Sequence, residues 1–342
     1  MNKFIIITII PLFFVVFLTG CAQKVQIRAI NPAEVSEMAS KKKVAVSQFR
    51  HDHIGLSGKI EAQIARQRID KKRYFTLLSR KDMSKVLKEQ KLQSSELMDE
   101  RTTSRVGKLI GAQAIISGDI ASANAESSHY YEDRQSCIKY DKEKGECTRY
   151  KYYRVRCNTT QASVSASLSI IDVEDGAVIY GDTLSREYSA NSCRYGSSRV
   201  LSKGQALNRL ASSIARDFVH KLTPNYIYFD VSLLDSIEID ATSKQKDMLA
   251  NALKYVEYAR YDKAKKILDA LMDAFDGKSY VVAYDYGVVN EATGKFEEAQ
   301  ELYQLADDLS IEPVEEINAA LSRIDALILK REEARAQMQA GR

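Results

Sequence analysis

The pattern of apolar residues changes at Pro224, and this change divides the chain into two parts of different fold class. Before Pro224, short β-rich runs alternate with amphipathic segments, whereas Ala, Leu, Lys, Glu and Tyr recur afterwards in helical periods. We therefore expect an α/β (α+β), three-layer-like domain with a mixed sheet and a long hairpin over residues 41–223. A linker over residues 224–245 and an all-α helical-repeat domain over residues 246–335 should follow.

Within the first domain, strands and helices are predicted to alternate. Strands are expected at residues 44–49, 75–78 and 112–120, and helices at residues 59–69, 79–90, 100–110 and 205–222. Residues 159–172 then alternate Ala, Val, Leu or Ile with Ser or Thr, which is typical of a half-buried strand. Residues 178–188 should return as its hairpin partner.

The N-terminus has the layout of an export signal. Lys3 supplies a positive charge, and residues 4–17 form an apolar run that ends close to Cys21. That run is shorter than the roughly 20 residues of a spanning helix. We therefore predict a signal peptide over residues 1–20 and a polar tether over residues 21–40.

The signal closes in Leu-Thr-Gly-Cys, which resembles the lipobox of bacterial lipoproteins. This resemblance implies that Cys21 is acylated and becomes the mature N-terminus. Acyl chains would then attach the mature protein to a membrane surface. An ordinary signal peptide or a short anchor helix is the alternative.

The mature chain carries four further cysteines, namely Cys137, Cys147, Cys157 and Cys193. An even number in an exported chain favours disulfides. Their spacings of ten, ten and thirty-six residues match no usual zinc motif. The sequence leaves all three connectivities open.

Residues 124–160 are rich in Tyr, Cys and charge, with a charged centre at residues 141–145. This composition predicts a long β-hairpin or loop. Because Tyr and Arg are favoured at protein interfaces, the segment is a candidate partner-binding surface. The candidate residues are Tyr130, Tyr131, Tyr150, Tyr152, Tyr153 and Arg154. The alternative is a twisted hairpin that packs its tyrosines on its own strands.

The sequence predicts no catalytic residue, no metal site and no cofactor, because it lacks the common nucleophile, phosphate-binding and zinc motifs. His51 and His53 flank Asp52, but exposed loop histidines are the favoured interpretation. Residues 55–58 (Gly-Leu-Ser-Gly) precede a helix and could bind an anion, although a plain turn is favoured. Lys and Arg outnumber Asp and Glu by only 50 to 46, so no nucleic-acid partner is expected.

An internal repeat indicates how the second domain is built. Residues 261–264 (Tyr-Asp-Lys-Ala) recur thirty-five residues later as Phe-Glu-Glu-Ala at residues 296–299. Both copies are expected in turns between amphipathic helices, with Gly287 before the second turn and Tyr303 after it. This arrangement resembles the tetratricopeptide repeat, in which small residues lie where helices cross. A generic helical hairpin is the alternative.

Four segments of the first domain resemble the CsgG family of secreted lipoproteins, which includes the curli secretion channel. They are Val-Ala-Val at residues 44–46 with Phe49, Phe-Thr-Leu-Leu-Ser-Arg at residues 75–80, the helix at residues 81–92, and Gly-Lys-Leu-Ile-Gly-Ala-Gln-Ala-Ile-Ile-Ser-Gly-Asp-Ile at residues 107–120. The resemblance implies an α/β domain and a lipid anchor on the periplasmic face of the outer membrane. LpoB-like members of the family use this domain for docking.

We therefore expect a non-enzymatic scaffold or accessory protein of an envelope assembly. The expected partners are envelope proteins, with peptidoglycan or its synthases as further candidates, and a homo-oligomer is a further possibility. The alternatives are a ring-forming outer-membrane secretion channel of the curli-transport type and an activator of a cell-wall synthase. The channel is disfavoured because ionised side chains occupy both alternating positions along residues 130–142.

Overall fold

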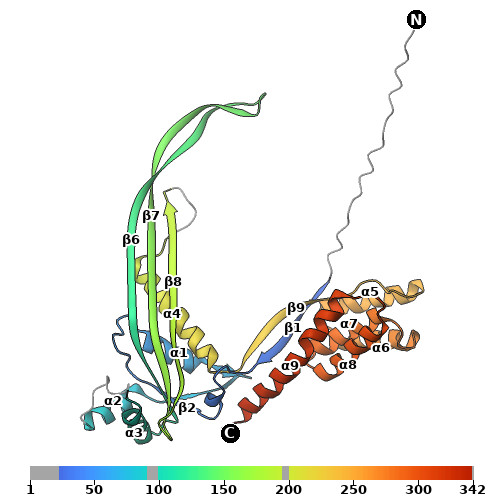
Figure 1. Ribbon diagram of the computed structural model, residues 1–342. Helices are drawn as coiled ribbons and strands as arrows, with labels where there is room; N and C mark the ends of the chain where they lie inside the picture. The colour runs from blue at the N-terminus through green and yellow to red at the C-terminus, as the bar shows by residue number, and fades with distance from the viewer. Residues whose placement is uncertain (1–22, 91–98, 195–199, 341–342) are drawn as a thin grey trace. The chain divides into compact units, whose positions relative to one another are not determined.

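The computed structural model in Figure 1 describes residues 23–90, 99–194 and 200–340. The predicted signal peptide and the predicted acylation site Cys21 lie outside the described residues. In the part that is described, no helix is both long and apolar enough to cross a bilayer.

The chain forms two compact units. Unit 1 combines the described residues up to Ala29 with Ile227–Ile328, and unit 2 combines Ile30–Tyr226 with the described residues from Leu329 onward. Each unit therefore draws on segments that are far apart in the sequence.

Unit 2 is built on a five-stranded mixed sheet with the strand order β5-β2-β6-β7-β8. Its strands are β2 (Lys43–Val46), β5 (Thr76–Leu77), β6 (Ala114–Asp141), β7 (Glu146–Asp172) and β8 (Val178–Cys193). Strand β2 runs parallel to both of its neighbours, whereas β6, β7 and β8 are antiparallel. The predicted mixed sheet is thus confirmed.

Helices cover both faces of this sheet. They are α1 (Leu56–Arg66) and α4 (Lys203–Lys221) on one face, and α2 (Arg80–Glu89) and α3 (Glu100–Ile110) on the other. Two consecutive residues of β2 pack against helices on opposite faces, because successive side chains of a strand point in opposite directions. Val46 packs in the cluster that contains Ile214 of α4, and Ala45 packs with Met83 of α2. The predicted three-layer arrangement is therefore present.

The serine-alternating strand is half-buried, as the sequence predicts. In β7, Ala166 and Leu168 are buried in the cluster beneath α4, while the intervening serines are partly exposed. Hydroxyl groups join neighbouring strands on the face opposite α4. Ser117 bonds to Ser169 (2.7 Å), and Ser185 donates to Ser165 (2.9 Å).

Unit 1 contains the helices after the sheet domain, as expected for the C-terminal repeats. They are α5 (Ser243–Glu257), α6 (Tyr261–Ala274), α7 (Tyr280–Ala292), α8 (Phe296–Leu309) and the first part of α9 (Glu315–Gln339). At the crossing of α7 and α8, a Cβ on Gly287 would lie 2.6 Å from the ring of Tyr303. A small residue is therefore required at this crossing.

Two strands of eight residues occupy positions where the sequence predicts a tether and a linker. Strand β1 (Lys24–Asn31) pairs with β9 (Asn225–Ser232) in a separate sheet. Ile27 of β1 and Val231 of β9 are buried in the core of unit 1. The tether prediction is therefore wrong from Lys24 onward, and the linker prediction is wrong over β9, because alternating apolar residues bury these strands.

Substitution of Gly107 tests whether α3 must approach the sheet closely. A Cβ at this position would lie 2.3 Å from a methyl group of Val173, whereas a Cβ on Gly58 of α1 meets nothing within 4 Å. We expect Gly107→Ala to lower the free energy of unfolding by about 1–3 kcal/mol through overpacking. Gly58→Ala should raise it by about 0.4–1 kcal/mol. Urea unfolding of both variants measures the difference, and equal stabilities would contradict the close approach.

Candidate partner-binding site

Strands β6 and β7 continue past the end of β8 and form a two-stranded arm, residues 130–157 (Figure 1). The last residue pair shared with β8 joins Cys157 to Cys193. The Arg194 amide then donates to the carbonyl of Arg156 (3.0 Å). Among the described residues, no further strand pairs with the arm beyond this point. The predicted hairpin is thus a ribbon without a third strand.

The charged tip forms a local turn. The Asp141 carboxylate accepts hydrogen bonds from the amides of Glu143 (3.0 Å) and Lys144 (3.2 Å). Gly145 then has a φ of 67°, a left-handed conformation that glycine adopts at little cost. The aspartate and the glycine therefore account for the reversal at the position that the sequence predicts.

Two disulfides brace the arm, one near its tip and one at its base. They join Cys137 to Cys147 and Cys157 to Cys193. An isolated two-stranded hairpin is marginally stable in water because it buries little apolar surface. Closing loops of 10 and 36 residues removes roughly 3 and 4 kcal/mol of unfolded-chain entropy, respectively. The crosslinks thus compensate for the missing core, and the sequence-based preference for disulfides is confirmed.

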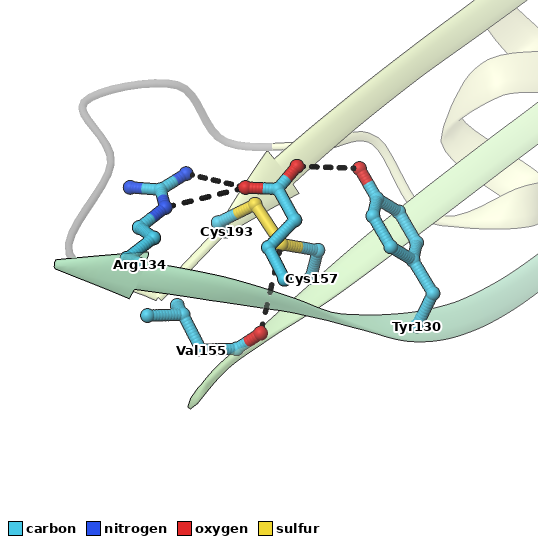
Figure 2. The surroundings of a disulfide bond; sticks show 6 residues. Tyr130, Arg134, Val155, Cys157 and Cys193 are labelled. Carbon is cyan, nitrogen blue, oxygen red and sulfur yellow. Dashed lines mark hydrogen bonds and ion pairs between the residues drawn. A yellow bond between two sulfur atoms is a disulfide. The ribbon is translucent and has the colours of Figure 1, made fainter. Parts of the chain in front are cut away.

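One face of the arm is organised around the basal disulfide (Figure 2). The Glu132 carboxylate lies within 4.8 Å of the sulfur atoms of Cys157 and Cys193. It accepts hydrogen bonds from the Tyr130 hydroxyl (3.3 Å) and from the Arg134 guanidinium (2.9 and 3.2 Å). Because the two sulfurs are bonded to each other, they offer no thiolate to a metal ion. This cluster is therefore an ion pair over a disulfide.

The other face of the arm carries most of the predicted site residues. Directly opposed residues of an antiparallel pair share a face, so Tyr131, Tyr150, Tyr152 and Arg154 lie on this side. Tyr131 and Tyr152 have 58% and 73% of their surface exposed. Arg154 pairs with Asp133 (3.0 Å), and this hydrogen bond raises the pKa of the Arg154 guanidinium.

The remaining predicted residues, Tyr130 and Tyr153, lie on the face that carries the basal disulfide Cys157–Cys193 and are also exposed. All five predicted tyrosines are exposed, from 37% for Tyr130 to 73% for Tyr152. Two further side chains near the tip, Ile138 and Tyr140, are exposed. Tyr140 belongs to the Tyr-rich segment that the sequence marks as a candidate surface, whereas Ile138 was not predicted. Strand alternation alone would not reveal Ile138, because a register shift follows Cys137.

The turn before α1, which the sequence presents mainly as a plain turn and secondarily as an anion site, is filled by the chain's own Asp52. The Asp52 carboxylate accepts from the amides of Leu56 (2.7 Å) and Ser57 (2.9 Å) and from the Ser57 hydroxyl (2.7 Å). This contact makes Leu56 the first helical residue, three positions before the predicted start of the helix. Next to Asp52, the His51 ring bonds to Asp119 (2.7 Å), while the His53 ring bonds to the carbonyl of His51 (2.8 Å).

The family model described as "Curli production assembly/transport component CsgG" matches residues 24–229. None of the curated proteins matches the chain significantly. The family match covers β1 and the whole sheet of unit 2, including the arm.

Solved structures with similarity to this chain include three bacterial proteins at 12% sequence identity. The LpoB C-terminal domain from Salmonella enterica matches 45% of this chain and 95% of its own length, with a TM-score of 0.27. Lipoprotein GNA1162 from Neisseria meningitidis matches 53% and 99%, with a TM-score of 0.29. The PelC dodecamer from Paraburkholderia phytofirmans matches 58% and 96%, with a TM-score of 0.24.

Removal of the tip disulfide tests whether crosslinks hold the arm. In a Cys137→Ser/Cys147→Ser variant, we expect tryptic cleavage after Arg149 and Lys151 to accelerate about tenfold or more, because local opening becomes easier. The free energy of global unfolding should fall by at most the roughly 3 kcal/mol of unfolded-chain entropy that this crosslink removes, and by less where the tip opens locally first. Timed proteolysis with mass spectrometry measures the rates. Cleavage at the wild-type rate would mean that the tip does not depend on its crosslink.

Proposed function

Because the chain belongs to the CsgG family, we propose that it is a non-enzymatic accessory or scaffold protein of a bacterial envelope assembly. The acylated Cys21 holds it on the periplasmic face of the outer membrane. The arm binds a partner protein, and the helical repeats of unit 1 offer a second binding surface. The observation that carries this proposal is the exposure of tyrosines on both faces of a ribbon without a core.

The side chains of the arm suit a protein interface. Tyrosine brings a large apolar ring and a polar hydroxyl, and it loses little rotational freedom on binding. Tyr131, Tyr150 and Tyr152 share one face with Arg154 and Arg156, whereas Asp133 is the acidic residue there. Tyr and Arg are the residue types that most often dominate binding energy. This face therefore favours a protein partner with an acidic patch.

A secretion channel of the curli-transport type is less well supported. Each channel strand would need one face that enters the hydrocarbon of the membrane. One face of the arm carries Glu132 and Arg134, and the other carries Asp133 and Arg154. An Arg or Lys at the middle of the bilayer costs about 2–4 kcal/mol on such a strand. Neither face of the arm therefore meets the requirement.

Truncation of two exposed tyrosines tests docking through the arm. We expect Tyr131→Ser/Tyr152→Ser to reduce recovery of crosslinked partners from envelope membranes at least tenfold, because truncating an interface anchor typically costs about 1–2 kcal/mol or more. Quantitative mass spectrometry of the recovered proteins gives the ratio to wild type. The free energy of unfolding should stay within about 0.5 kcal/mol, since both rings are exposed.

Leu109→Ser/Val178→Ser is a control in unit 2 outside the arm. Its two side chains are 56% and 47% exposed and belong to neither proposed binding surface. The control should recover partners at the wild-type level. Unchanged recovery by the arm variant would exclude docking through Tyr131 and Tyr152. Recovery of a cell-wall synthase would identify the assembly as one for wall synthesis and would favour the activator alternative.

A further inference from the structure

Unit 2 contains a second candidate site at its sheet edge, remote in sequence from the arm. A small hairpin of β3 (Arg68–Ile69) and β4 (Lys72–Arg73) lies beside the start of β2. Between them is a pocket with a volume of about 340 Å³, which is within the size range of small-ligand sites. Lys42, Tyr74 and Thr76 line it.

Two buried polar atoms in this pocket lack hydrogen-bond partners among the described residues. One is the ammonium nitrogen of Lys42, and the other is the hydroxyl of Tyr74. The Tyr74 side chain is only 8% exposed. Lys42 places its ammonium 3.6 Å from the centroid of the Tyr74 ring, a cation–π contact that leaves its N–H donors available. Buried polar groups in proteins are normally hydrogen-bonded, so both atoms require a partner.

The electrostatic surroundings favour an anionic partner. Lys72 and Arg73 add two cations to the lining, next to Lys42. The acidic residue in the lining is Asp70, whose carboxylate accepts a hydrogen bond from the Tyr226 hydroxyl (2.8 Å). No described carboxylate pairs with the Lys42 ammonium.

Burial shifts the pKa values of Lys42 and Tyr74 in the direction expected for ionisable groups that have no counter-charge nearby. It lowers the pKa of the Lys42 ammonium to about 8 and raises the pKa of the Tyr74 hydroxyl to about 12. Tyr74 therefore stays a neutral hydrogen-bond donor over the physiological range. Lys42 remains mostly charged near neutral pH, and an anion beside it would restore the pKa toward its ordinary value.

The backbone of the hairpin is held in an uncommon conformation. Asp70 and Lys71 both have positive φ angles, 48° and 68°, in a two-residue turn where Asn-Gly is the usual choice. Met338 of α9 adds an apolar side chain to the lining of the pocket. The neighbouring Gln337 bonds to the amide (2.6 Å) and the carbonyl (3.1 Å) of Ala33, so this end of α9 is fixed within unit 2.

We propose that this pocket binds a small ligand through a carboxylate or phosphate group, with the Lys42 ammonium and the Tyr74 hydroxyl as direct donors. Lys72 and Arg73 balance the remaining negative charge at the pocket mouth. The apolar side chains of Ile69 and Met338 contact the uncharged part of the ligand. This site is independent of docking through the arm.

Calorimetric titration of the full chain in detergent tests the site. Inorganic phosphate and acetate are titrated separately at constant ionic strength, with chloride as the supporting anion. We expect saturable binding of at least one of them and a rise in the melting temperature at saturation. Whichever of the two anions binds more tightly indicates whether the natural ligand carries a phosphate or a carboxylate group. Absence of saturable binding by both anions would overturn the proposal.

Three variants separate direct contact from general charge. Lys42→Met keeps the stem of the side chain and removes the ammonium, while Tyr74→Phe keeps the ring and removes the hydroxyl. Both should weaken binding at least tenfold. Lys71→Met removes an equal charge from the same turn, but Lys71 does not line the pocket, so its affinity should match wild type. An equal loss of anion affinity in all three variants would show that binding depends only on surface charge and would overturn the assignment.

The pH dependence of stability gives a second readout that needs no ligand. The folded state holds the Lys42 proton less tightly than the unfolded state, whose ordinary lysine pKa is 10.5. Unfolding therefore takes up a proton between pH 8 and pH 10.5, and stability relative to Lys42→Met should rise across that window. Asp70, Lys72, Arg73 and Tyr74 face the same pocket and are present in both proteins.

Saturating anion should remove this rise, because it returns the Lys42 pKa toward its ordinary value. Lys42→Met should also be at least as stable as wild type at pH 7 without the anion, since it deletes a buried charge that has no partner. A large loss of stability in Lys42→Met would show that the ammonium serves the fold and would overturn the proposal.

Discussion

The arm depends on one constraint, which is that a two-stranded ribbon cannot build a hydrophobic core. Along β7, burial ends close to the point where β8 ends. Cys157 and Val155 are still buried, whereas residues 148–154 are exposed. The disulfide to Cys193 lies at this transition and joins the last supported pair of strands covalently. The part of the arm beyond it is held by backbone hydrogen bonds, the tip crosslink and cross-strand pairs.

The same constraint explains why the surface of the arm mixes tyrosines with charges. An exposed ribbon with apolar residues along both edges would invite pairing with other chains. Here charged pairs such as Glu132 with Arg134 and Asp133 with Arg154 interrupt the aromatic positions. Such exposed pairs add little stability, typically about 0–1 kcal/mol, so their main effect is on solubility and on the choice of partner. The aromatic rings therefore remain available without making the arm broadly adhesive.

Local patterns in the sequence predicted the elements whose burial depends on near neighbours. The Ala-Ser alternation of β7 and the glycine that ends α3 at Gly111 both have local causes, and both features are present. The pairing of β1 with β9 was missed because the two strands lie about 190 residues apart and each looks polar at alternate positions. The sequence also predicted cysteines that pair, but it could not choose the connectivity, which depends on the register of β7 and β8.

Two places in unit 2 concentrate hydrogen-bond donors, and they differ in how those donors are satisfied. At the start of α1, the amides of Leu56 and Ser57 receive the Asp52 carboxylate, which is part of the same loop. At the edge of the sheet, the Lys42 ammonium and the Tyr74 hydroxyl have no comparable acceptor among the described residues. An apolar side chain of similar length at position 42 would occupy this space without the desolvation cost of a buried ammonium. The chain thus supplies its own anion at the first place, whereas the pocket beside β2 has donors that match an anion from outside.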